Sequence, residues 1–342
     1  GELASPRRAA LPLIAALGGM AVPALIYVAF NGTGPGAAGW GVPMATDIAF
    51  AVGLMALLGR RVPLGLKVFL VALAIVDDLG AVLVIALFYT ASLSLPALAI
   101  AGAALGLLAL ANRLGVRATS IYAALGLLLW VALLKSGIHA TIAGVLLACT
   151  IPARPRLAES DFARFAGEAL DRYRRDDLGD DRLSQRQQEA VLALEKACHA
   201  VLTPMQRLTH VLHPWAVFAI MPVFALANAG VTLDTGLTGL AGSRIAWGVA
   251  LGLCVGKPLG IFLATWLAIR LGGLAPPVGT GLRHLLGAAC LGGIGFTMSL
   301  FIGALAFTDP ALAAQAKIGI LAGSLVSAIA GVAVLLRAKP AA

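Results

Sequence analysis

The sequence predicts an all-α polytopic membrane protein, and its composition is the first reason. Of the 342 residues, 60% are hydrophobic and only 12% are charged, whereas soluble domains have about 25% charged residues. A soluble fold of this composition would lack the charges to cover its surface, and a disordered chain needs low hydrophobicity and high charge. The 40 glycines and the 6% of aromatic residues favour closely packed helices over a membrane β-barrel.

The hydropathy pattern is the second reason, because it predicts about ten transmembrane helices. Several are shorter than the ~20 residues that span a bilayer without tilt. In chain order, the apolar stretches are 9–30, 40–58, 67–89, 96–112, 119–134, 138–151, 213–229, 245–269, 284–307 and 317–336. Their connections are short apart from 153–210. In that loop, 162–178 and 183–202 combine mixed charges with spaced apolar residues, which predicts two surface helices.

The charges between the apolar stretches predict the orientation of the chain. Ten basic and ten acidic residues cancel within 153–210, so the net charge of +9 comes from the rest of the chain. Basic residues gather in alternate connections, and the opposite set is nearly bare. Because positive loops stay in the cytoplasm, both chain ends and the long loop are predicted to be cytoplasmic. No basic face with interleaved aromatic residues occurs, so nucleic acid is not an expected partner.

Two of the apolar stretches contain weak points near their middle. Pro43 and Thr46 weaken the second stretch around Asp47, within VPMATDIAF (42–50). In the ninth stretch, GGIGFTMS (292–299) contains three glycines and Thr297. Both patterns predict interrupted helices, although a kink without an ionic role remains the alternative for the glycines.

The two weak points occupy equivalent places in 9–89 and 245–336. Each lies in the second of three consecutive stretches, and the first triple starts inside whereas the second starts outside. Paired interrupted helices in two inverted repeats mark the binding site of secondary transporters. Broken helices expose partial positive charge at N-terminal ends and partial negative charge at C-terminal ends. The carboxylate of Asp47 can balance the partial positive charge, and the ammonium of Lys257 can balance the partial negative charge.

The third stretch contains two adjacent acids, Asp77 and Asp78, halfway along its length. A charged side chain in mid-membrane costs about 2.5–3.5 kcal/mol on insertion scales, so it is a functional candidate. Adjacent helix positions differ by about 100°, so one acid can face a cavity while the other lies at its edge or meets a neighbouring helix. Burial and mutual repulsion favour protonation, and carboxylate oxygens also bind hard cations. The pair predicts a site that takes protons or a metal ion in turn; a polar packing contact or salt bridge is the alternative.

The eighth stretch contains Lys257 near its centre, too deep to reach the membrane surface. Pro258 follows it, removes a backbone donor and frees a carbonyl nearby. A structural ion pair with a buried aspartate and a role in a transport cycle are both open interpretations. They are compatible, because a pair that breaks on protonation is itself a switch.

Two histidines, His210 and His213, stand before Pro214 at the predicted cytoplasmic start of the seventh stretch. Histidine titrates near physiological pH, so a part in pH sensing is one interpretation, and no metal-ligand spacing accompanies them. The sequence also lacks a phosphate-binding loop of the form GxxxxGK[ST]. No cofactor is predicted.

The segments that carry these residues resemble, in order, the NhaA-type bacterial sodium/proton antiporters. The matching segments are 39–90, 134–146, 210–215, 224–231, 256–261 and 292–302. The resemblance implies a multi-pass antiporter of the bacterial inner membrane that is not an enzyme. Such proteins export Na+ or Li+ electrogenically in exchange for H+, and they serve sodium and pH homeostasis.

The resemblance also implies roles for individual residues. Asp77 and Asp78 match the paired carboxylates that carry the cation and the proton. Asp47, with Thr46, matches the charge at the crossing of the interrupted helices, and Lys257 matches the lysine that pairs with Asp77. In the second repeat the crossing is expected around 295–299, which includes Thr297.

Three departures from the family qualify these expectations. The family has two further helices and a dimerising hairpin before the first residue of this chain, so we expect an N-terminally truncated sequence and a homodimer for the full-length protein. The loop 155–205 is longer than is usual. Thr209 stands where an acidic residue implicated in pH response is expected, which leaves the pH set-point open although His210 and His213 remain.

The expected mechanism is alternating access with competition between Na+ and H+ at one site. The proton gradient and the membrane potential would drive it, the latter with about 2.3 kcal/mol per charge per 100 mV. An intramembrane aspartyl protease is the rival from the enzyme class, because it also needs two membrane aspartates, from different helices. It explains neither Lys257 nor the repeated weak points. A cation channel is the other rival, and it would conduct without proton counterflow.

Overall fold

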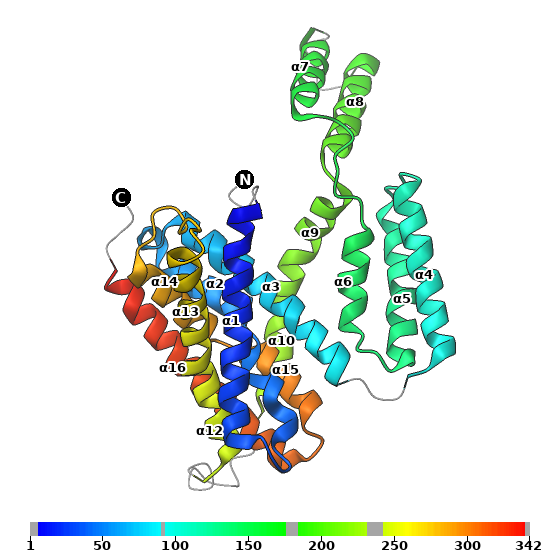
Figure 1. The fold of residues 1–342 in the computed structure, drawn as a ribbon. Helices are drawn as coiled ribbons and strands as arrows, with labels where there is room; N and C mark the ends of the chain where they lie inside the picture. Colours follow the sequence, from blue (N-terminus) through cyan, green and yellow to red (C-terminus); the bar gives the residue numbers. More distant parts are fainter. Residues whose placement is uncertain (1–5, 90–92, 176–183, 231–241, 339–342) are drawn as a thin grey trace. The chain divides into compact units, whose positions relative to one another are not determined.

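The structure, a computed structural model, describes residues 6–89, 93–175, 184–230 and 242–338. Helices and their connections make up this part of the chain, and no strand occurs in it, as the sequence predicts. The chain divides into two compact units (Figure 1). One unit comprises Gly1–Tyr89 together with Ala219–Ala342, and the other comprises Thr90–Phe218.

The first unit begins with three apolar segments, of which the second is interrupted. The elements are α1 (Pro6–Asn31), η1 (Ala37–Met44), α2 (Ile48–Leu57), η2 (Gly59–Arg61) and α3 (Leu64–Phe88). Residues 45–47 between η1 and α2 are non-helical. Asp47 has extended backbone angles, and its side chain accepts the Phe50 N–H at 3.2 Å, which fixes the start of α2. The predicted weak point in the second stretch is therefore a real interruption.

The C-terminal part of the first unit has two more irregular segments. Its elements are α10 (Met221–Ala229), α12 (Arg244–Leu251), η5 (Gly252–Gly256), α13 (Lys257–Arg270), α14 (Leu282–Gly292), α15 (Phe296–Ala306) and α16 (Pro310–Leu336). Helices α14 and α15 are bent by 41° at the glycine-rich break 293–295, again where the sequence predicts a weak point. The short π-helix η5 joins α12 to α13 and ends directly before Lys257.

Close packing of glycines brings α1 against α13, and the two helices run side by side in Figure 1. A Cβ at Gly260 would overlap the carbonyl oxygen of Gly18 and lie 3.0 Å from Val22 Cβ. Such backbone contact is typical of helix pairs in lipid, where small residues rather than a hydrophobic driving force set the interface. It places Lys257, one turn before Gly260, in the interior of the unit.

Two apolar clusters fill this unit. One contains Leu66, Leu70 and Ile294 among others, and the other contains Ala45, Leu253 and Ile320 among others. The break at 293–295 thus contributes to the first cluster and the break at 45–47 to the second. The interrupted segments contribute to the interior of the unit, where other helices can satisfy non-helical backbone at membrane depth.

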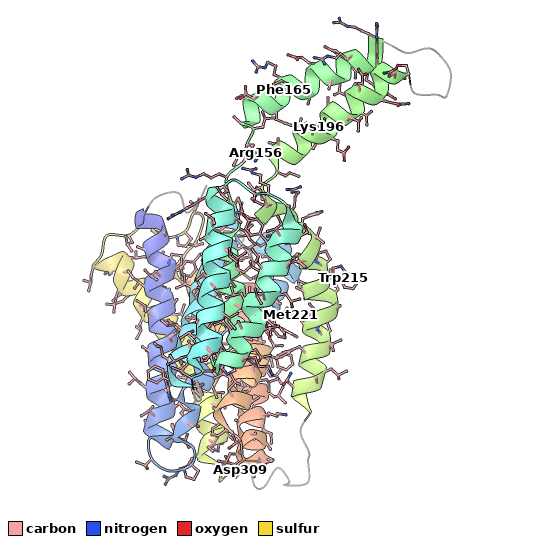
Figure 2. The ribbon with its side chains drawn as sticks, turned by 90° about the vertical axis from the view of Figure 1, so that its right-hand side faces the viewer. Arg156, Phe165, Lys196, Trp215, Met221 and Asp309 are labelled. Carbon is pink, nitrogen blue, oxygen red and sulfur yellow. The ribbon has the colours of Figure 1, made fainter. Side chains whose placement is uncertain are left out.

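The second unit contains helical hairpins. Its elements are α4 (Leu95–Arg113), α5 (Thr119–Ser136), α6 (Thr141–Thr150), α7 (Glu159–Arg175), α8 (Gln185–Val201) and α9 (Pro204–Trp215), and the π-helix η3 (Ala216–Ile220) follows α9. Helices α4, α5 and α6 share a core. Helices α7 and α8, marked by Phe165 and Lys196 in Figure 2, pack on each other. The hairpin closes at its base, where the Arg156 N–H donates to the Ala200 carbonyl at 3.0 Å.

The predicted spans correspond to the observed helices with two differences. In the described residues, eight helices are long and apolar enough to cross a membrane, and the bent pair α14–α15 makes a ninth. The stretch 138–151 forms only the ten-residue α6, about 15 Å long at 1.5 Å per residue. Helices α7 and α8 correspond to the predicted surface helices, whose ends at 176–178 and 183 lie outside the described residues.

The second difference is that the predicted helix start at residue 213 is wrong. The helix begins at Pro204, because Thr203 and Gln206 form a reciprocal capping box there. This helix continues through η3 into α10 as one candidate span, Pro204–Ala229. His210 and His213 therefore lie inside α9 and not at its start.

Candidate functional site

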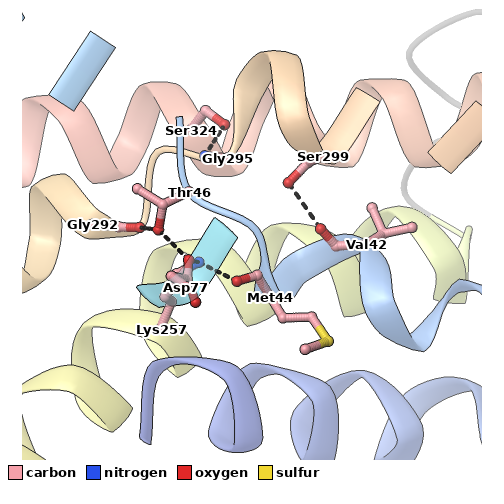
Figure 3. A network of polar contacts seen from close by, with 9 residues as sticks. All are labelled: Val42, Met44, Thr46, Asp77, Lys257, Gly292, Gly295, Ser299 and Ser324. Carbon is pink, nitrogen blue, oxygen red and sulfur yellow. Dashed lines mark hydrogen bonds and ion pairs between the residues drawn. The ribbon is translucent and has the colours of Figure 1, made fainter. Parts of the chain in front are cut away.

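The centre of the candidate site is an ion pair between α3 and α13. Asp77 lies in the middle of α3, and Lys257 is the first residue of α13. Both side chains are fully buried, and Lys257 Nζ lies 2.6 Å from Asp77 Oδ2 (Figure 3). Two opposite charges in contact offset part of the large desolvation cost of each, although a buried pair by itself is weak evidence for stability.

Each interrupted segment reaches this ion pair. Thr46 Oγ1 lies 2.7 Å from Asp77 Oδ2 and 2.9 Å from the carbonyl oxygen of Gly292, the last residue of α14. A hydroxyl has one proton, so Thr46 donates to only one of these acceptors at a time. Lys257 Nζ also donates to the carbonyl of Met44, the last residue of η1 (Figure 3). The polar contacts thus join the C-terminal ends of two helical segments to Asp77.

Asp47 occupies the opposite, N-terminal ends of the broken helices. Its Oδ1 accepts the Phe50 N–H, and its Oδ2 accepts the Thr297 N–H at 3.0 Å and the Thr297 hydroxyl at 2.6 Å. Its own N–H donates to the Ile294 carbonyl at 2.6 Å. One carboxylate therefore caps α2 and α15, where the partial positive charges of both helices meet.

Asp78 differs from Asp77 in its surroundings. It is half-buried, whereas Asp77 is fully buried, as expected for adjacent positions on one helix. Oδ1 of Asp78 and Oδ1 of Asp77 are both buried, and neither has a hydrogen-bond partner in the described part of the chain. Asp78 also lies within electrostatic range of Asp77, Lys257 and Asp47. A buried carboxylate oxygen without a donor is a vacant acceptor for a proton or a hard cation.

Two serines of the site, Ser324 and Ser327, were not predicted from the sequence, whereas Ser299 ends the segment 295–299 where the second crossing is expected. Ser299 Oγ donates to the Val42 carbonyl at 2.8 Å. Ser324 Oγ accepts the Gly295 N–H at 3.2 Å, and Ser327 Oγ donates to the Leu253 carbonyl at 3.2 Å. The available signal was the run of small residues Gly319, Gly323, Ser324 and Ser327 in the last apolar stretch, which is typical of a helix that packs tightly against others.

The remaining predicted residues belong to the second unit. His210 and His213 are exposed on α9. Thr209, which stands beside them, donates its hydroxyl to the Met205 carbonyl of the same helix at 2.9 Å. Their proposed part in pH response stays a prediction.

Comparison with known proteins indicates one class. The family model described as Na+/H+ antiporter 1 matches residues 1–335. The chain is 52% identical to the Na(+)/H(+) antiporter NhaA of Oleidesulfovibrio alaskensis, over 99% of this chain and 76% of the relative. It is 50% identical to the Na(+)/H(+) antiporter NhaA 2 of Syntrophotalea carbinolica, over 99% of this chain and 78% of the relative. It is 48% identical to the Na(+)/H(+) antiporter NhaA of an Enterobacter species, over 98% of this chain and 75% of the relative.

Proposed function

Because this chain belongs to the Na+/H+ antiporter 1 family, we propose that it exchanges Na+ or Li+ for H+ at Asp77 and Asp78 by alternating access. The protein is a secondary transporter and not an enzyme, which removes the aspartyl protease from the interpretations of its membrane acids. One observation carries the proposal. Two adjacent aspartates each keep a buried oxygen without a hydrogen-bond partner among the described residues, beside a lysine and two helix interruptions.

Competition between the two ions follows from the chemistry of these oxygens. Na+ and Li+ are hard cations, and the vacant oxygens of Asp77 and Asp78, with Thr46 Oγ1, form a set of hard oxygen ligands. Protonation neutralises a carboxylate and removes its attraction for a cation, while a bound cation opposes protonation. The site therefore holds the metal ion or protons, but not both.

Lys257 links the occupancy of the site to its structure. Its ammonium pairs with Oδ2 of Asp77, whereas the vacant oxygen of Asp77 is Oδ1. A proton or a cation on Asp77 weakens the attraction for Lys257, which then keeps the Met44 carbonyl as its partner. Met44 ends η1, so a change at Asp77 is transmitted to the interrupted segment of the first triple.

The two interruptions support a conformational cycle. We propose that 9–89 and 245–336 are inverted repeats that move against each other around the site. The breaks at 45–47 and 293–295 touch through Asp47 and Ile294, and a few non-helical residues can absorb the backbone rotation of a hinge. Na+ would bind from the cytoplasm, leave outward, and be replaced by protons on the return. The potential supplies about 2.3 kcal/mol per charge per 100 mV if the exchange is electrogenic.

The membrane setting completes the proposal. We place this multi-pass protein in the bacterial inner membrane, with the loop 153–210 and the C-terminus in the cytoplasm, on the strength of the charge distribution. The resemblance to dimeric antiporters supports a homodimer. Sodium and pH homeostasis is the role that such an exchange would serve.

The deciding experiment replaces Asp78 by asparagine in the protein as its gene encodes it. Na+ added to acid-loaded proteoliposomes should trigger proton release for the natural protein and none for Asp78→Asn, because the amide takes up no proton in this pH range and lacks the negative charge that holds Na+. Asp309→Asn is the matched control. Asp309 caps α16 through the Ala311 N–H at 2.8 Å, and asparagine caps a helix equally well.

Retained exchange in Asp78→Asn would rule out the assigned carrier. Ion flux at zero proton gradient with large single-channel currents would instead identify a channel. Exchange must also persist in Asp309→Asn, since that variant tests whether the loss of any carboxylate impairs the protein.

A further inference from the structure

We propose that Ser324 and Ser327 on α16 are positioning residues for the ion site. They hold the break between α14 and α15, and the π-helix η5, in the registers that direct Thr297 toward Asp47 and Lys257 toward Asp77. The inference rests on the proposed function of that site, and it assigns a task to a helix that carries none of the ionisable groups of the site.

The two serines lie on the face of α16 that packs against the irregular segments. Positions three apart in a helix are neighbours on one face, and both side chains are buried. Gly323 beside them allows direct backbone contact, since a Cβ there would lie 2.9 Å from the Ala250 carbonyl oxygen and 3.1 Å from Leu253 Cβ. The hydroxyls are thereby presented to backbone groups of other helices.

Ser324 satisfies the beginning of α15. Its Oγ accepts the Gly295 N–H at 3.2 Å (Figure 3). It also accepts the Phe296 N–H at 3.2 Å. The next N–H along the chain, that of Thr297, is accepted by Asp47. The first N–H groups of a helix have no partner within it, and in a membrane they must find one elsewhere in the protein. Ser324 therefore holds the two backbone N–H groups directly before Thr297, and with them the position of Thr297 beside Asp47.

Ser327 donates to a carbonyl that loses its α-helical donor in the π-helix. The Lys257 N–H donates to Gly252 O, five residues back, and not to Leu253 O, which would be its α-helical partner. The following residue, Pro258, has no N–H to offer. The Ser327 hydroxyl takes this place at Leu253 O, at 3.2 Å.

The position of Lys257 depends on this hydrogen bond from the Ser327 hydroxyl to the Leu253 carbonyl. If the segment returned to α-helical register, the Lys257 N–H would bond Leu253 O, and the side chain would be displaced by one residue, a rotation of about 100° around the helix. By donating to Leu253 O in the π-helical register, Ser327 reduces the advantage of the α-helical register. The ammonium then stays directed at Asp77, 2.6 Å from its oxygen.

The break between α14 and α15 meets η5 at the same point. A Cβ at Gly293 would lie 2.5 Å from Leu253 O and 2.6 Å from Ser327 Oγ. Only a glycine leaves room there for the hydroxyl to reach the carbonyl. One turn of α16 therefore holds both irregular segments, and the register of one constrains that of the other.

The test compares Ser324→Ala and Ser327→Ala with Thr265→Val in proteoliposomes. Thr265 is a matched control because its buried hydroxyl donates to the Ile261 carbonyl of its own helix, at 2.6 Å, and so bonds within α13 and not to another helix in the described part of the chain. Each serine variant should raise the KM for Na+ about fivefold, the ratio given by one lost hydrogen bond, and shift the pH profile of exchange. Thr265→Val should leave both at the natural values.

Two further measurements separate positioning from general stability and from failure of the proposed function. Thermal unfolding shows whether each variant is folded, and deuterium uptake of the peptides around 295 and 253 reports the loss of the bonds without any transport assay. Natural KM and pH profile in folded serine variants, with or without faster uptake, would overturn the positioning role. Absence of exchange in the natural protein would overturn the proposed function instead, whatever the uptake.

Discussion

The Lys257–Asp77 pair illustrates how a single residue can be both costly and necessary. Both groups are removed from water, and the lysine has two acceptors, the Asp77 carboxylate and the Met44 carbonyl. Breaking a buried pair by removing one partner costs far more than the pair contributes, because a charge is left alone in a medium of low polarity. The pair is thus sensitive to anything that changes the charge of Asp77.

Replacing Lys257 by methionine should destabilise the protein by about 3–5 kcal/mol at pH 8. The loss should be smaller at pH 5, because Asp77 can then be protonated and a neutral carboxyl group needs no counter-charge. Thermal unfolding in detergent at both pH values measures this. Adding Asp77→Asn should restore most of the stability at pH 8.

The exposed Lys135 on α5 provides the control, since Lys135→Met removes an equal charge at the surface. An equal loss of stability in Lys257→Met at both pH values would contradict the assignment of Asp77 as the partner that titrates.

The ionisable residues of the site and the threonines Thr46 and Thr297 were predictable, whereas the serines of α16 were not. Asp77, Asp78 and Lys257 stand out because a charge in a long apolar stretch is expensive and therefore conspicuous. Ser324 and Ser327 have no such cost when they back-bond or face another helix, so in a sequence they are indistinguishable from other small residues. Their role depends on hydrogen bonds to the backbone of Gly295 and Leu253, and a sequence does not show that these distant residues lie beside the serines.

At the scale of elements, interruptions and register determine the site more than helix content does. The interruptions were predicted, because Pro43 and the glycines of 292–295 weaken a helix locally. The π-helix η5 was not, since one extra residue in a turn leaves the hydropathy of 252–256 unchanged. The start of α9 was missed for a related reason: its first turns are polar, and only the cap at Thr203 marks them.

The close contact between Gly260 of α13 and Gly18 of α1 should be important for the stability of the protein. Gly260→Leu should destabilise the protein by about 1–3 kcal/mol or more, because the new side chain overlaps the backbone of Gly18 and forces α1 from α13. Chemical unfolding in detergent is the measurement, and Na+-triggered proton release should fall with it because α13 begins with Lys257.

Gly102→Ala on α4 is the matched control for this substitution. A Cβ at Gly102 meets no atom within 4 Å, and alanine in a helix is more stable than glycine by about 0.5–1 kcal/mol. Unchanged stability in Gly260→Leu would mean that α1 and α13 do not pack as closely as the structure has them.

At the scale of the molecule, the residues that form the candidate site belong to one unit. Asp47, Asp77, Asp78, Lys257 and Thr297 all lie in the unit formed by Gly1–Tyr89 and Ala219–Ala342. The hairpin of α7 and α8 belongs to the other unit and packs on itself, with Ala169 and Ala190 buried. Its base is closed by backbone bonds from Arg156 and Leu157 to Ala200.

Replacing residues 159–199 by a short Gly-Ser linker should therefore leave Na+-triggered proton release within about twofold of the natural rate, by the near-additivity of independent parts. The ends can be joined without strain, because the Leu157 N–H lies 3.3 Å from the Ala200 carbonyl. Proteoliposome assays over a range of pH make the comparison. A folded deletion variant that has lost exchange, or whose pH profile has moved, would assign the hairpin a regulatory part.

The π-helical turn before Lys257 has a consequence for comparing this protein with distant transporters. A turn closed over five residues instead of four accommodates one additional residue in the same length of helix. Where a remote homologue has a regular helix at this place, a gapless alignment will match Lys257 to the wrong neighbour. A one-residue gap inside 252–256 is needed to bring functionally equivalent positions into the same column.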